Sequence, residues 1–111
     1  MFNVVEVTKE NDINKILRLA KQNYRGPINL LFTSLWDSPS ERLVSSLQKA
    51  YGIREQEENG VEPVYLINSF DTPHSFVIFN TTKVPHLVNI NQEGVLSLDY
   101  LPDIYDFLGL K

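Results

Sequence analysis

The side chains best placed to do chemistry lie in one short segment that starts at Trp36 and contains Asp37, Ser38, Ser40 and Glu41. A carboxylate or hydroxyl at the start of a helix accepts hydrogen bonds from backbone N–H groups that have no partner within the helix. Asp37 can cap the helix that follows, and Ser38 with Glu41 has the spacing of a capping box, so either residue can be the cap. The same helix end is also suited to receive a peptide or an anionic group.

Catalysis by these hydroxyls is not indicated by the sequence. A serine nucleophile needs a neighbouring base and donors for the oxyanion, and neither is recognisable near Ser38 or Ser40. His74 and His86 are the only histidines, and no acidic or histidine cluster with ligand spacing accompanies them. We therefore expect no catalytic residue, no metal and no cofactor. His86 has two interpretations, an ordinary histidine at a strand end, which is favoured, or a proton-sensitive contact.

The chain has no cysteine among its 111 residues. Disulfide exchange, zinc–thiolate sites and iron–sulfur clusters all use cysteine thiolates. The sequence therefore excludes these three kinds of chemistry for the chain by itself.

The composition is typical of a globular protein, with 42% hydrophobic and 22% charged residues, and we expect one domain over residues 1–111. A formal net charge of −4 and scattered basic residues argue against nucleic-acid binding. The first residues lack the features of a secretory signal, and no apolar run approaches the roughly 18 residues that span a bilayer. We expect a cytoplasmic protein that does not bind membranes.

Hydrophobic periodicity predicts alternating strands and helices. Residues 28–33 are almost continuously apolar, as in a strand covered on both faces, and a helical pattern separates them from a β-rich start, which indicates a parallel crossover. The expected elements are a strand at 2–7, a helix at 13–24, a strand at 28–33, a helix at 43–51, an exposed loop at 54–60, a strand at 64–67, a short helix within 72–83, strands at 87–90 and 95–98, and a helix at 104–108.

The segment from Thr72 to Lys83 allows two interpretations. The run Phe76–Phe79 has the composition of a strand, whereas Thr72 and Pro73 together are a typical helix start with a cap and a first-turn proline. We predict a short helix here.

The order βαβαβ, then α, ββ and α, resembles the thioredoxin fold over nearly the whole chain. Residues 36–40, Trp-Asp-Ser-Pro-Ser, stand where this family has Trp-Cys-Gly-Pro-Cys, and the segment Leu30–Trp36 resembles the strand that delivers the family's active site. Asn68–Asp71 resembles the Asn and Asp that follow the family's third strand, and Val84–Pro85 resembles the pair that contains its cis-proline. The resemblance implies an α/β fold, a central mixed sheet flanked by helices.

The chain departs from this family at several positions that the redox reaction needs. Asp37 and Ser40 replace both cysteines, and Leu31 stands where many thioredoxins place a buried acidic proton acceptor. A glycine that often follows the fifth strand has no counterpart around Leu98–Tyr100. The resemblance therefore implies a redox-inactive member that is not a thiol–disulfide oxidoreductase.

The resemblance suggests a noncatalytic module that binds an extended peptide of another protein through Trp36, Asp37, Ser38, Val84 and Pro85, or a subunit of a complex. Trp36 is either an exposed contact anchor or a packing residue.

The alternative is a glutathione-transferase-like enzyme in which Ser38 or Ser40 orients the thiol of glutathione. Such enzymes carry an acidic-Ser pair soon after the cis-proline and usually add a helical domain. The segment from Pro85 to Gln92 has no such pair. The sequence therefore favours the binding module.

Overall fold

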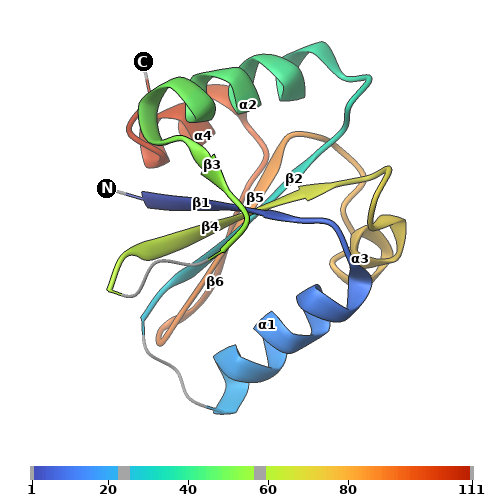
Figure 1. Ribbon diagram of the computed structural model, residues 1–111, viewed down its shortest axis with the longest axis vertical. Coiled ribbons are helices and arrows are strands. Elements are labelled where there is room, and N and C mark those ends of the chain that lie inside the picture. The colour runs from blue at the N-terminus through green and yellow to red at the C-terminus, as the bar shows by residue number, and fades with distance from the viewer. Residues whose placement is uncertain (1, 23–25, 57–59, 111) are drawn as a thin grey trace.

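A central six-stranded sheet lies between two layers of helices in the computed structural model, which describes residues 2–22, 26–56 and 60–110 (Figure 1). The strand order is β3-β1-β4-β2-β5-β6. The elements are β1 (Phe2–Val7), α1 (Glu10–Gln22), β2 (Ile28–Thr33), α2 (Ser38–Tyr51), β3 (Ile53–Arg54), β4 (Glu62–Asn68), α3 (Pro73–Ile78), β5 (His86–Asn91), β6 (Gly94–Leu98) and α4 (Leu101–Phe107).

The sheet is mixed, as expected. β3, β1, β4 and β2 run parallel to one another, whereas β5 is antiparallel to β2 and β6 is antiparallel to β5. The two central strands are buried along most of their length, which agrees with the continuous apolar pattern of β2. The strands β2 and β4 therefore form the buried centre of the sheet, from which the loops at one end emerge.

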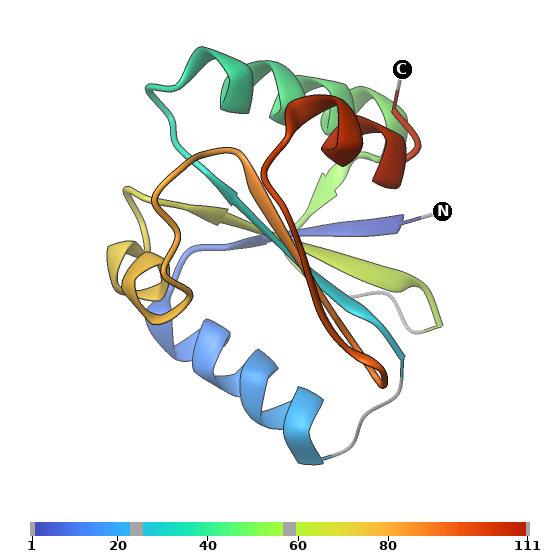
Figure 2. The same cartoon turned by 180° about the vertical axis from the view of Figure 1, so that it is seen from behind.

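Each face of the sheet has its own hydrophobic core, because successive side chains of a strand point to opposite faces. Figure 2 shows α2 and α4 together on one face and α1 with α3 on the other. Leu31 of β2 packs in the α2 and α4 core with Leu43 and Leu47, whereas the adjacent Phe32 packs in the opposite core with Ile13. Leu31 and Phe32 are both fully buried, so β2 contributes to the cores on both faces of the sheet.

The structure corrects the expected boundaries of several elements. The segment predicted as a loop from Arg54 begins in β3, which pairs with β1 through Val4 and Val5. Two residues are too few to show the alternation of apolar and polar side chains that identifies a strand, so this strand was not predictable from the sequence. α1 begins at Glu10 rather than at residue 13, and β4 extends to both sides of the predicted segment. The predicted end of the first helix at Tyr24 and part of the predicted loop, residues 57–59, lie outside the described residues.

The segment 72–83 contains a helix, as predicted, but only over Pro73–Ile78. Phe76 and Phe79 both pack against Phe32, with ring centroids 5.1 and 5.4 Å away, whereas Val77 and Ile78 are exposed. A separation of three residues places Phe76 and Phe79 on one side of a helix, which a strand would not do. Despite its strand-like composition, the run therefore packs in the manner of a helix, with Phe76 and Phe79 toward the core.

The other two predicted helices are present, but both begin earlier than the segments expected at 43–51 and 104–108: α2 begins at Ser38, and α4 spans Leu101–Phe107. α2 ends at Gly52, which has a φ of 75° and donates its N–H to Gln48 O at 3.0 Å. α4 carries Pro102 in its first turn. Across the part of the chain that the structure describes, no helix is long and apolar enough to cross a membrane.

Candidate binding site at the start of α2

The predicted site residues lie at one end of the sheet, where β2 ends and β5 begins (Figure 1). β2 ends at Thr33, and a short turn, closed by a 3.3 Å hydrogen bond from Asp37 N to Ser34 O, leads into α2. Phe32 is paired with His86, the first residue of β5. Because β2 and β5 are antiparallel, Val84 and Pro85, which precede β5, lie at the same end of the sheet as Trp36, which follows β2.

Asp37 is the cap of α2, which decides between the two alternatives left open by the sequence. Its Oδ2 accepts hydrogen bonds from Ser40 N at 3.0 Å and from Ser40 Oγ at 2.8 Å. Ser38 is the first residue of the helix and is exposed. Ser40 is fully buried, and its hydroxyl is used by the cap, so it is poorly placed to orient a thiol ligand.

Trp36 is an exposed residue, because 77% of its surface is accessible. Of the two interpretations of Trp36, the structure thus excludes packing in the core. Its ring stands edge to face against Phe70, which is itself 64% exposed, and the ring centroids are 5.7 Å apart. We refer to Trp36 and Phe70 as the aromatic pair.

Phe70 is a residue that sequence reasoning missed. It lies in the turn between β4 and α3, among residues that are mostly polar. Asn68 Oδ1 accepts a 2.8 Å hydrogen bond from Phe70 N, and Ser69 N donates to Thr33 O at 3.0 Å, which ties this turn to the end of β2. The sequence does show a large aromatic residue in a turn that begins with Asn68, and this could have indicated an exposed ring. Its contact with Trp36, however, depends on the tertiary fold.

The Val84–Pro85 peptide bond is cis, and the proline side chain is buried. The next residue, His86, is half-buried, and its Nε2 is hydrogen-bonded to Ser97 Oγ. Burial lowers the pKa of His86 below its ordinary value of about 6.5, and the nearby negative charge of Asp99 acts in the opposite direction. Its hydrogen bond within the sheet supports the interpretation of His86 as a strand-end residue.

Leu31 is completely buried, between the paired positions Leu66 and Leu87 on its neighbouring strands. The position expected to carry a proton acceptor in a redox-active relative is therefore surrounded by aliphatic side chains. No group at this position of β2 can accept a proton.

A cavity of about 510 Å³ lies between α2 and the β1 and β3 side of the sheet, and it reaches the turns that follow β2 and β4. We call it the α2 pocket; its lining includes Glu6, Leu35, Glu41, Val44, Ile53 and Leu66. None of the five predicted binding residues contributes to it. The described part of the chain also contains no group of three or more His, Asp or Glu side chains that could hold a metal ion.

Solved thioredoxin structures have the same fold. Thioredoxin O1 from Arabidopsis thaliana in the oxidized state matches with a TM-score of 0.65 and 20% sequence identity, over 96% of each chain. Thioredoxin NaTrxh from Nicotiana alata matches with a TM-score of 0.67 and 13% identity, over 96% of this chain and 90% of that chain. The reduced Schistosoma mansoni thioredoxin pre-protein matches with a TM-score of 0.64 and 13% identity, over 96% of each chain.

The sequence matches no protein-family model, and no curated protein matches it. At these identities the structural matches establish the thioredoxin fold and leave the function to the residues of the site.

Proposed function

We propose that this chain is a redox-inactive, thioredoxin-like binding module that holds an extended segment of another protein and thereby acts as a subunit of a complex. The segment would lie across Trp36, Asp37, Ser38, Val84 and Pro85, with Phe70 added on the basis of its contact with Trp36. The absence of cysteine supports a role without thiol exchange.

The exposure of the aromatic pair is the observation that carries this proposal. Trp36 and Phe70 are each well over half exposed, although a soluble fold gains free energy by burying such rings. Aromatic side chains that stay on the surface, beside a backbone able to bind a ligand, are typical anchors of protein interfaces. The pair therefore supports a partner that covers it.

The main chain beside the pair supports an extended ligand rather than a globular contact alone. The pairing of β5 with β2 begins at His86, so the peptide groups of Val84 lie before the paired residues. Val84 itself is half-buried. Extended peptides bind by adding main-chain hydrogen bonds to such groups, while side-chain pockets provide specificity. Val84 would supply the hydrogen bonds, and the aromatic pair would supply the apolar contact.

Affinity capture from the native host, with four versions of the chain as bait, tests the proposal. The baits are the wild type, Trp36→Ala, Pro85→Ala and the control Val95→Ala, which removes an apolar side chain that is 69% exposed on β6. A true partner should bind the wild type and the control but be lost with Trp36→Ala. Because Trp36 is the only tryptophan, its fluorescence should also change when the purified partner is added.

A partner that binds folded Trp36→Ala as well as it binds the wild type would contradict the proposed site. Stability is measured on the same four proteins, so that loss of binding is not confused with loss of folding.

A further inference from the structure

The α2 pocket has an apolar floor, formed by Leu66 of β4 together with Val44 of α2 and Ile53 of β3. The register of the strands places Leu66 on this face of the sheet. Leu31 is paired with Leu66, and Leu66 is paired with Glu6 at the outer side of the sheet. These three positions point to the face covered by α2, on which Leu31 is fully buried and Leu66 is 7% exposed. β3 ends its pairing with β1 at Val5, so the side of β1 at Glu6 is left without a neighbouring strand in the described chain.

The opening of the pocket carries three carboxylates from three different elements. Glu6 comes from β1, Glu41 from the first turn of α2, and Asp71 from the turn after β4. All three residues are exposed, and within the described chain none has a hydrogen-bonding or ion-pairing partner for its carboxylate. Their charges are therefore available to a ligand.

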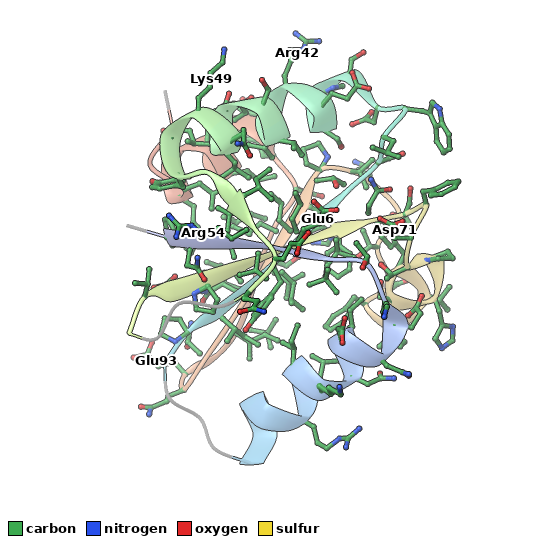
Figure 3. The ribbon with its side chains drawn as sticks, viewed as in Figure 1. Glu6, Arg42, Lys49, Arg54, Asp71 and Glu93 are labelled. Carbon is green, nitrogen blue, oxygen red and sulfur yellow. The ribbon has the colours of Figure 1, made fainter. Side chains whose placement is uncertain are left out.

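Lys49, the basic residue among those that line the pocket, does not neutralise the three carboxylates. Lys49 belongs to the lining, but Figure 3 shows its side chain extending from α2 away from the sheet, whereas Glu6 lies at the sheet itself. An apolar floor below uncompensated carboxylates favours a ligand that combines an apolar group with positive charge.

We propose that the α2 pocket is a second binding site, which takes a short basic segment of a partner protein with one large apolar side chain inserted between Val44, Ile53 and Leu66. Lysine or arginine residues on either side of that anchor face Glu6, Glu41 and Asp71. A volume of about 510 Å³ is within the range of ligand sites, roughly 300–1,000 Å³, and accepts such an anchor with part of its backbone.

A basic partner segment fits better than a second copy of this chain. The chain has a formal net charge of −4, so a second copy would bring further negative charge to the carboxylates. A peptide can present an apolar anchor and several cations together, which matches carboxylates contributed by three separate elements. The site shares none of the five residues of the proposed Trp36 site, and the two proposals can therefore fail independently.

The test uses the full chain and three synthetic peptides, followed by nuclear magnetic resonance. The peptides are acetyl-Lys-Lys-Leu-Lys-Lys-amide, the same peptide with Ser in place of Leu, and the same peptide with Glu in place of every Lys. The Leu-containing basic peptide should shift the methyl signals of Leu35, Val44 and Leu66 in a saturable way. The Ser peptide should bind about 10- to 150-fold more weakly, because it lacks the leucine side chain that is buried in the pocket. The acidic peptide should not bind.

Two triple variants distinguish the effect of the carboxylates at the pocket from the effect of the net charge of the chain. E6Q/E41Q/D71N removes the three carboxylates at the pocket, and E55Q/E93Q/D106N removes three exposed carboxylates elsewhere, with the same change of net charge. Glu93 lies on the hairpin between β5 and β6, far from Glu6 in Figure 3. The first variant should bind the basic peptide about tenfold more weakly, since each exposed ion pair is worth about 0.2–1 kcal/mol, and the control should stay within about twofold.

A third variant, Ser45→Phe, places a ring into the pocket from an exposed position of α2 and should abolish binding without removing any core side chain. The proposal is overturned if the basic peptide does not shift the three methyl signals, if the two triple variants weaken it equally, or if Ser45→Phe leaves its affinity unchanged. Spectra of the free variants establish that each one is folded.

Discussion

Trp36 and Phe70 stand edge to face at the surface, with ring centroids 5.7 Å apart and an angle of 74° between the ring planes. The two residues come from different loops, which are tied together by the hydrogen bond from Ser69 N to Thr33 O. An aromatic contact of this kind is worth about 0.5–1.5 kcal/mol beyond area burial. The loops are thus held in place while most of both rings stays accessible.

The first prediction concerns the cost of removing Trp36. Trp36→Ala should lower the free energy of unfolding by no more than about 1.5 kcal/mol, because it loses the contact with Phe70 and little buried area. Phe32→Ala is the comparison, since Phe32 is fully buried and its truncation should cost about 3–5 kcal/mol. Urea unfolding followed by circular dichroism measures both. A loss of 3 kcal/mol or more for Trp36→Ala would show that Trp36 is mainly a packing residue.

The second prediction concerns thiol chemistry. The wild-type chain should not reduce an insulin-type disulfide, because it has no thiolate to attack the substrate. In D37C/S40C the two sulfurs should form a disulfide, since the side chains of Asp37 and Ser40 are already in contact, with Oδ2 and Oγ 2.8 Å apart.

Turnover by the D37C/S40C variant should nevertheless be slow. Leu31 is buried among aliphatic side chains and supplies no proton acceptor for the new thiols. Thiol titration of the reduced and oxidised variant measures disulfide formation, and an insulin turbidity assay measures turnover. Activity equal to that of a conventional thioredoxin would show that Leu31 does not limit the reaction.

Most of the fold was predictable because its local signals agree. β2 is a continuous apolar run between helical patterns, and such a run is typical of a central strand. The helix within 72–83 was predictable from its proline start, against a strand-like composition, but its end was not. Asn80, at a φ of 51°, already lies beyond the helix, and the pattern of the sequence does not mark this position.

The functional surfaces were only partly predictable, because they depend on contacts between residues far apart in the chain. The resemblance indicated Trp36 as a site residue, but the sequence did not determine whether its side chain is exposed or packed in the core. Phe70 was missed because a single apolar residue in a polar turn is common and means nothing until its neighbour is known. The α2 pocket was missed for the same reason, since its lining comes from β1, β3, β4, α2 and the turns that follow β2 and β4.

The third prediction concerns a buried row of amides at the opposite end of the sheet. Asn89 Nδ2 donates to Asn29 Oδ1 at 2.7 Å, and Asn29 Nδ2 donates to Glu62 Oε2 at 2.7 Å. Asn29→Ala should lower the free energy of unfolding by about 1–3 kcal/mol, because it leaves the buried amide of Asn89 without this acceptor. Urea unfolding of Asn29→Ala, Asn89→Ala and the double variant measures the coupling.

The two single losses should not add up in the double variant, because both remove the same hydrogen bond. An interaction energy of about 0.5 kcal/mol or more is expected for residues in direct contact. Strict additivity would contradict a stabilising link between Asn29 and Asn89.

The last prediction concerns the effect of pH through His86. Burial lowers the pKa of His86 in the folded chain, so between that pKa and the unfolded value of about 6.5 the unfolded chain binds more protons. The stability linked to His86 is therefore present above about pH 6.5 and decreases as the pH falls through this window. His86→Gln should reduce the change in the free energy of unfolding between pH 7.5 and pH 5.5, measured by urea unfolding at both values. His74→Gln, which removes the only other histidine, is measured alongside as the matched control. If both variants show the same pH dependence as the wild type, the titration of His86 does not contribute to stability, and its hydrogen bond to Ser97 forms equally well with a charged imidazole.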